Sequence, residues 1–496
     1  MNKHNKTIRP LVLISVMLAM FVGAVEATIV STAMPAIAGE LGGFSRYSWI
    51  FSAYLLMSTV TVLIYGKLAD LFGRKPVFFV GLSIFLFGSI LCGFASSMEQ
   101  LIVFRLIQGL GAGAVMPIAT TIVGDIYSTE ERAKIQGYLS SVWGVSAVSG
   151  PVIGGLIVQY WDWKYVFWVN VPLGLLAMAG IFFFLHEPVT ERKVAIDVKG
   201  AVLLTTSLSI ILFWLVEGGQ SFSRASSASL LLLLLGVALF TLFIRMERKA
   251  KEPMMPFSIW KNPVILYANL VSLTTGVILI GVSSYLPTYV TGVMEQPAMI
   301  AGFTLTAMSI GWPIASSVAG HLLIRFGTFA VSFAGGISLV TGSLMFVWMS
   351  GGSGPLWAAF SSFFIGVGMG LTSTSFIVTI QGAVSREQRG SATAANMFMR
   401  NFGNTVGAAI FGAVLNGSLM SKFRESNLDF EVNDINLLLT EDSRLTLPIS
   451  KLHILQTALD GSLQWVYIAV LVFAVISLLL ILRIPRGKVV LHDNND

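Results

Sequence analysis

Long apolar stretches separated by short polar segments run along almost the whole chain. About fourteen can be recognised, each near the ~20 residues that a helix needs to cross the ~30 Å hydrocarbon layer of a membrane. The predicted spans are residues 11–36, 49–66, 77–95, 101–122, 136–158, 166–186, 200–217, 228–245, 263–285, 299–320, 329–349, 355–378, 391–416 and 464–483. The pattern predicts an all-α polytopic membrane protein.

Composition supports this class. The chain has 496 residues, of which 55% are hydrophobic and 11% charged, whereas a soluble domain carries about 25% charged residues. A formal charge of +6 would suggest nucleic acid as the partner of a soluble protein. Basic residues collect in the cytoplasmic loops of membrane proteins, so no nucleic-acid partner is expected. The single cysteine, Cys92, excludes an intramolecular disulfide and a cysteine metal cluster.

The charge pattern also predicts the orientation. The basic segment of residues 1–10 precedes an apolar run that is too long for a signal peptide, so we interpret it as an uncleaved first span. With an even number of spans, both termini lie on one side, and most of the 31 Lys and Arg residues fall on that side. The positive-inside rule then makes both termini cytoplasmic. The longest outside connection, residues 417–461, is either a lid or a spacer.

The chain also contains an internal repeat. The stretch 66–73 (GKLADLFG) is similar to 320–327 (GHLLIRFG), and 109–113 (GLGAG) is similar to 366–370 (GVGMG) at nearly the same offset. We therefore expect an N-terminal six-helix half (1–190), two inserted helices (191–260) and a C-terminal six-helix half (261–496). Two related halves around a central site are typical of a transporter that rocks between two open states.

Five stretches resemble a known family. Residues 66–75 (GKLADLFGRK) are similar to the loop motif of the major facilitator superfamily, and residues 101–113 (LIVFRLIQGLGAG) to its helix-4 motif. Residues 144–155 (GVSAVSGPVIGG) resemble its helix-5 antiporter motif. Residues 25–35 (VEATIVSTAMP) and 161–174 (WDWKYVFWVNVPLG) resemble its fourteen-helix drug–proton antiporter branch. The resemblance covers the whole chain and implies the major facilitator fold.

Two charged residues lie deep inside predicted spans. Glu26 lies about 22 Å from the start of its helix, and the branch commonly has Asp at this motif position. A buried carboxylate is costly and usually marks a functional site, so Glu26 is a candidate for binding the coupling proton; a helix-packing hydrogen bonder is the alternative. Arg105 is expected at a similar depth, either as a proton relay or as a structural anchor. Sequence does not decide whether they touch.

The motifs predict two further sites. The first is the helix-5 antiporter motif, where glycines allow close helix contact and a proline weakens the helix; its residues are Gly144, Gly150, Pro151, Gly154 and Gly155. Generic close packing would also explain these glycines. The second, implied by the resemblance, is a cytoplasmic gate that latches the halves together in the outward-facing state. Its residues are Gly66, Asp70, Gly73, Arg74 and Asp125, and ordinary interfacial charges are the alternative.

A substrate cavity is predicted between the halves. Its candidate lining residues are Met116, Trp312, Met397, Phe398 and Arg400, although most of them would serve equally well as ordinary packing residues. Arg400 either faces the cavity or extends toward the cytoplasmic face. The only acid between residues 300 and 416 is Glu387, in a loop. We therefore expect neutral, zwitterionic or singly charged substrates rather than dications.

Together these features predict a proton-coupled antiporter in the bacterial cytoplasmic membrane that exports small lipophilic compounds. The chain contains no nucleotide-binding P-loop, so a proton gradient is the expected energy source. No cofactor and no metal are expected, and by resemblance the protein works as a monomer. The alternatives are an exporter of an endogenous lipid or metabolite, a proton-coupled uptake symporter and a non-transporting sensor.

Overall fold

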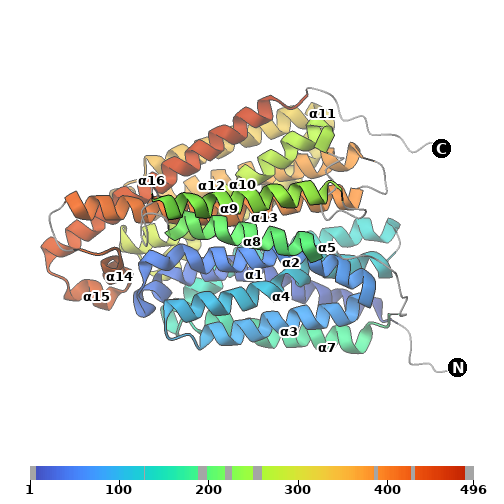
Figure 1. Ribbon diagram of the computed structural model, residues 1–496, viewed down its shortest axis with the longest axis horizontal. Coiled ribbons are helices and arrows are strands. Elements are labelled where there is room, and N and C mark those ends of the chain that lie inside the picture. The colour runs from blue at the N-terminus through green and yellow to red at the C-terminus, as the bar shows by residue number, and fades with distance from the viewer. Residues whose placement is uncertain are drawn as a thin grey trace.

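The computed structural model describes residues 7–127, 129–187, 198–217, 226–249, 260–384, 389–425 and 430–485, and these ranges contain helices and no strand (Figure 1). The helices are α1 (Arg9–Leu41), α2 (Tyr47–Phe72), α3 (Arg74–Gly93), α4 (Met98–Ile126), α5 (Thr129–Tyr160), α6 (Tyr165–Trp168), α7 (Asn170–Phe184), α8 (Val198–Glu217), α9 (Ser227–Glu247), α10 (Pro263–Gly292), α11 (Ala298–Val347), α12 (Gly354–Gly382), α13 (Arg389–Glu425), α14 (Asn436–Leu439), α15 (Glu441–Thr446) and α16 (Ile449–Leu482). Short 3-10 turns cover Phe44–Arg46 (η1), Gly351–Ser353 (η3) and Val432–Ile435 (η5).

The predicted membrane spans are confirmed as helices. Within the described ranges, thirteen helical stretches are long and apolar enough to cross a membrane. A shorter apolar helix, Lys199–Leu215 within α8, corresponds to the remaining predicted span. The spans predicted at 299–320 and 329–349 are joined in α11, which is interrupted at Gly327 with φ of 76°. A positive φ suits glycine because it lacks a Cβ.

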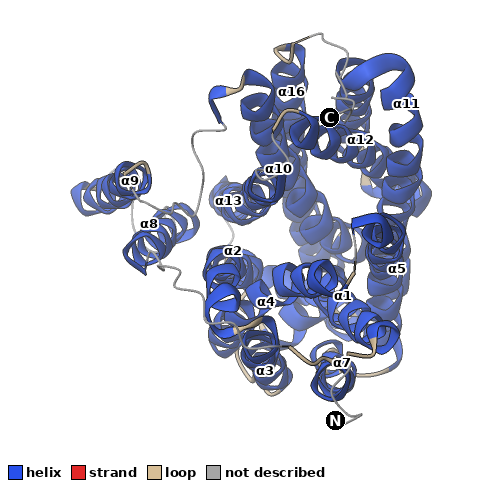
Figure 2. Ribbon diagram, turned by 90° about the vertical axis from the view of Figure 1, so that its right-hand side faces the viewer, coloured by secondary structure: helices blue, strands red, loops and turns tan. Residues whose placement is uncertain are grey.

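The helices form two bundles with α8 and α9 beside them (Figure 2). We call α1–α7 the N-bundle and α10–α16 the C-bundle. Helix α8 packs against α2 and α13, and Trp49 of α2 donates a 2.8 Å hydrogen bond to Glu217 of α8. We call the end at which α1 begins and α16 finishes the terminal end. The opposite end carries η5, α14 and α15, which we call the cap (Figure 1).

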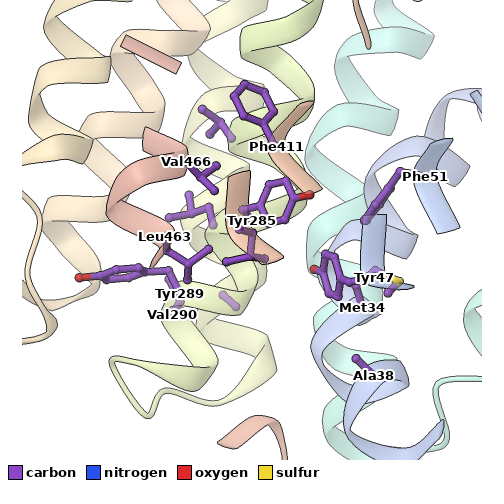
Figure 3. Close-up of a cluster of buried hydrophobic side chains, with 14 of the residues drawn as sticks. Met34, Ala38, Tyr47, Phe51, Tyr285, Tyr289, Val290, Phe411, Leu463 and Val466 are labelled. Carbon is purple, nitrogen blue, oxygen red and sulfur yellow. The ribbon is translucent and has the colours of Figure 1, made fainter. Parts of the chain in front are cut away.

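At the cap end the two bundles share one hydrophobic core. Figure 3 shows the rings of Tyr47 (α2) and Tyr285 (α10) facing each other across the boundary, with centroids 5.7 Å apart. The Tyr47 hydroxyl donates to the carbonyl of Ser284 at 2.7 Å and lies 2.8 Å from the Thr288 hydroxyl. Burial of these aromatic rings, together with the hydrogen bonds of Tyr47, closes the structure at this end.

At the terminal end the core is divided. One buried cluster, with Val12, Phe78 and Ile122, belongs entirely to the N-bundle. Another, with Ile265, Phe376 and Ile481, belongs entirely to the C-bundle. A Cβ added at Gly66 or at Gly320 would meet no heavy atom within 4 Å. Among the described residues, the bundles therefore share a core at the cap end and have separate cores at the terminal end.

The segment predicted as a long outside connection, 417–461, is mostly helical, which corrects the predicted boundaries. Helix α13 continues to Glu425, and α16 begins at Ile449 rather than near residue 464. The reason is an apolar face at helical spacing, since Leu455, Leu459 and Leu463 are all buried. Helices this long extend beyond the hydrocarbon layer, and the cap rests on their extensions.

The cap contacts both bundles. Asn433 accepts a 3.2 Å hydrogen bond from the backbone N–H of Ser45, next to α2. Arg444 donates a 2.7 Å hydrogen bond to the carbonyl of Thr291 in α10. Thr440 lies so close to α1 that a Cβ added at Gly39 would be 2.6 Å from its methyl group. These contacts favour a lid over a free spacer.

Candidate functional site

The two charges predicted inside the N-bundle form a buried ion pair. The side chain of Glu26 in α1 is 0% exposed and that of Arg105 in α4 is 2% exposed. The guanidinium Nη1 of Arg105 donates to Oε1 of Glu26. The structure thus brings together two residues that are 79 positions apart in sequence. Because removing one partner would leave an uncompensated charge in a dry interior, the two side chains depend on each other.

Three polar residues complete this site, which we call the charge cluster: Glu26, Arg105, Ser89, Gln108 and Asn170. Asn170 of α7 donates to Oε2 of Glu26 at 2.5 Å and to the Ser89 hydroxyl at 3.1 Å. Gln108 accepts from Arg105 at 2.6 Å and donates to the Ser89 hydroxyl at 3.1 Å. The sequence analysis assigned no role to Ser89, Gln108 or Asn170. Their signal was polarity within apolar spans, and for Gln108 also a position one helical turn after Arg105.

Arg105 has further partners on α2. Its Nε donates to the carbonyl of Ile50 at 3.3 Å, and its guanidinium lies 4.0 Å from the ring centroid of Tyr54. A cation over an aromatic face is stabilised by the ring quadrupole. These contacts, together with Gln108, keep the guanidinium solvated by protein groups even if Glu26 becomes neutral.

The predicted helix-5 motif packs directly beside the charge cluster. A Cβ at Gly150 would overlap the Thr28 hydroxyl, two residues from Glu26 on α1. A Cβ at Gly154 would lie 2.9 Å from the carbonyl oxygen of Ile29. Only glycine allows α5 to approach α1 this closely. The position of α5 is therefore sensitive to the residues that flank the charge cluster.

The same motif also forms the boundary between the bundles. A Cβ at Gly155 would lie 2.9 Å from the Cα of Met299 in α11, and one at Gly302 of α11 would overlap the carbonyl oxygen of Pro151. Gly144 faces the proline of α11 in the same way, at 3.5 Å. Helix α5 is therefore pressed between α1 of its own bundle and α11 of the other. It provides a physical connection from the charge cluster to the bundle boundary.

The predicted gate residues lie at the terminal end. Arg74 pairs with Asp125 at 3.0 Å and donates to the carbonyl of Ala69 at 2.7 Å. Gly73, with φ of 90°, makes the turn between α2 and α3. The side chain of Asp70 lies outside the described residues. These contacts connect α2, α3 and α4 within the N-bundle, and the latch between the two halves stays a prediction.

An acid that the sequence analysis did not single out organises this region. The carboxylate of Glu187 accepts hydrogen bonds from the backbone N–H groups of Arg74 and Lys75, at 2.8 and 2.9 Å. It thereby caps the N-terminus of α3, where negative charge is favourable. Lys75 returns to the carbonyls of Phe182 and Leu185. A cavity of about 280 Å³ adjoins these groups, lined by Thr7, Arg9, Arg74, Ile122, Asp125, Ile126, Leu185, His186 and Glu187.

The structure separates the predicted cavity residues. Arg400 of α13 and Trp312 of α11 lie together, with the guanidinium 6.0 Å from the ring centroid. Phe398 instead stacks on Phe402 at 6.1 Å and packs against the cluster around α8 and α9. Residues two apart on a helix point about 200° apart, so Phe398 does not share the surroundings of Arg400, and its place in a cavity stays a prediction. Met116 packs beside Gly23 of α1, and the side chain of Met397 is 39% exposed.

Comparison with known proteins gives the family. The family model of the Major Facilitator Superfamily matches residues 16–408. The chain is 36% identical over 417 residues to the multidrug transporter protein MdtP of Bacillus subtilis (84% of this chain and 77% of that one). It is 32% identical over 488 residues to multidrug resistance protein 3 of Bacillus subtilis (96% of this chain and 95% of that one).

Solved structures agree on the fold. A bacterial homologue of the human lysosomal transporter Spinster, in an inward-facing and unoccupied conformation, has a TM-score of 0.70 at 14% identity, covering 96% of this chain and 97% of that one. The nucleoside transporter NupG has a TM-score of 0.60 at 13% identity, covering 96% and 97%. Together with the helical bundles and the family model, these similarities show that the chain is a multi-pass membrane transporter of the Major Facilitator Superfamily and not an enzyme.

Proposed function

We propose that this protein is a proton-coupled antiporter that exports small lipophilic compounds by alternating access. The observation that carries the proposal is the sealed charge cluster in the N-bundle, in which a fully buried carboxylate has one cationic and one amide partner. Relatives over most of the chain are named as multidrug proteins, which supports lipophilic compounds as substrates.

The proposed export direction depends on how the protein is oriented in the cytoplasmic membrane. With the protein in a cytoplasmic membrane and both termini inside, the terminal end is cytoplasmic and the cap lies outside. The conformation described above is then closed to the outside, because the bundles share a core at the cap end. Export requires that this core separate and that the bundles close at the terminal end, burying Gly66 and Gly320.

Proton coupling follows from the partners of the charge cluster. A proton on Glu26 neutralises the carboxylate and leaves Arg105 held by Gln108 and by its existing contacts on α2, at Ile50 and Tyr54. Helix α2 packs on α13 of the C-bundle, where the hydroxyl oxygens of Thr59 and Thr405 lie 3.3 Å apart. A change in the charge pair therefore acts on α2 at the bundle boundary. This is the physical route by which protonation biases one conformation over the other.

The test is proton movement in liposomes. Purified protein is reconstituted with a pH-sensitive dye inside, a proton gradient is imposed, and lipophilic compounds are added one at a time. Wild-type protein should move protons in response to a substrate, and Glu26→Gln should not, because it cannot take up the proton. The matched control is Glu40→Gln on the same helix, at a carboxylate that is 52% exposed. It should behave as wild type.

Two outcomes would count against the proposal. Compound-dependent proton movement that survives in Glu26→Gln would remove the coupling role from the charge cluster. If no compound moves protons in wild type, export of a metabolite by another coupling, or a sensor function, becomes the better interpretation.

A further inference from the structure

Arg400 lies deep within the C-bundle. It is 11 residues into α13 from Arg389, about 16 Å along the helix axis. Its guanidinium lies over the indole ring of Trp312 on a different helix, 6.0 Å from the centroid. This contact holds the guanidinium beside α11 within the C-bundle.

No acid neutralises this cation in the part of the chain that the structure describes. Arg400 has no ion pair and no hydrogen bond there, and its contact with Trp312 is the interaction that it makes. Helix α10 contains no acid, and Glu387, the only acid between residues 300 and 416, lies outside the described residues. Arg105 differs because it is paired with Glu26. Arg400 and Trp312 are both partly exposed, and an intramembrane charge is costly unless it is paired or faces water or a polar group. Among the described residues, the guanidinium is therefore open to a polar partner from outside the protein.

The face of α13 that carries Arg400 is polar. Asn396 and Asn404 lie one helical turn before and after it. Asn396 donates to Asn269 at 3.0 Å and to Ser272 at 2.7 Å, both on α10. Among described residues, the amide oxygen of Asn404 and the amide nitrogen of Asn269 are buried without a hydrogen-bond partner. These two polar atoms belong to the same α10–α13 contact as Arg400, and a polar ligand bound there could give them a hydrogen-bond partner.

We propose that Arg400 and Trp312 bind the anionic group and the aromatic body of the transported compound. A guanidinium pairs with a carboxylate through two parallel N–H···O bonds, and the indole offers a flat apolar surface for an aromatic ring. The preferred substrates are then amphiphiles with one negative group, either anions or zwitterions. This inference rests on the proposed export function and specifies its substrate class.

The test is equilibrium binding without a gradient. The full chain in lipid nanodiscs is titrated against pyrenebutyrate and its neutral amide, pyrenebutyramide, with fluorescence anisotropy as the readout. Wild type should bind the carboxylate at least about tenfold more tightly, as hydrogen bonds to a charged group allow. Arg400→Gln should abolish this preference, and Arg400→Lys should retain part of it. The matched control is Arg325→Gln, an exposed arginine that also lies over a phenylalanine, at 5.2 Å, and it should bind as wild type.

The outcomes separate this inference from the proposed function. Equal binding of the two probes by wild type would overturn the inference. This comparison needs no variant, so it remains decisive even if Arg400→Gln folds poorly. A carboxylate preference that survives in Arg400→Gln would overturn it as well. Glu40→Gln should keep the preference, because its exposed carboxylate lies in the other bundle and outside the charge cluster. If wild type moves no protons in liposomes but shows a carboxylate preference that depends on Arg400, the proposed proton antiport is overturned and the binding inference stands.

Discussion

Asn170 donates its 2.5 Å hydrogen bond to the oxygen of Glu26 that Arg105 does not hold. One carboxylate thereby connects three helices, α1, α4 and α7. A buried network in which each group has a partner fixes side-chain orientation, whereas one missing member leaves a costly gap. The charge cluster is consequently both a structural joint of the N-bundle and the place where a proton would change its balance.

Removing Arg105 tests whether the charge cluster stabilises the N-bundle. Arg105→Gln leaves the Glu26 carboxylate buried without its cation, and we expect the free energy of unfolding to fall by about 3–5 kcal/mol. The double variant Glu26→Gln/Arg105→Gln removes both charges and should be more stable than Arg105→Gln. Unfolding in mixed micelles measures both values. Additive losses in the double variant would mean that the two charges do not interact energetically.

The boundary between the bundles gives the second prediction. Gly302→Ala places a methyl group against the carbonyl of Pro151, so α11 must move away from α5. We expect a loss of about 1–3 kcal/mol of stability, as for overpacking in a core, and slower transport. Thermal unfolding and a transport assay are the measurements. Gly417→Ala on α13 is the control, since its added Cβ meets no atom within 4 Å; equal effects of the two substitutions would contradict the prediction.

The membrane spans and the two buried charges could be predicted from the sequence because both are local features of the chain. Hydrophobicity over about 20 residues is a local property, and a charge such as Glu26 within such a run is visible by itself. The contact between Glu26 and Arg105 is not local, because it depends on how α1 packs on α4. The same holds for Phe398 and Arg400, which are near each other in sequence but face different neighbours. For the cap, the sequence left a lid and a spacer open and did not give the helix boundaries, because the apolar positions of this segment are spread among charges.

Glu187 provides the third prediction. Glu187→Ala removes the acceptor of the first two backbone N–H groups of α3, and loss of a helix cap costs about 0.5–2 kcal/mol. We expect a lower unfolding temperature with little change in substrate binding, because the site lies at the terminal end. His186→Ala, at the adjacent exposed position, should melt as wild type. A matching decrease in His186→Ala would point to the segment as a whole rather than to the carboxylate.

The cap provides the last prediction. Thr440 and Gly39 lie close enough for a disulfide between cysteines placed there, since a Cβ at Gly39 falls 2.6 Å from the Thr440 methyl group. The native Cys92 is buried and should not compete. We expect Gly39→Cys/Thr440→Cys to form a disulfide under oxidation and to lose transport, because the bond ties the cap to α1 and the cap end cannot separate. A reductant should restore activity, and Gly39→Cys alone should transport in both conditions. Full transport by the cross-linked protein would mean that the cap stays on α1 throughout the cycle, so that opening for release has to occur elsewhere along the boundary between the bundles.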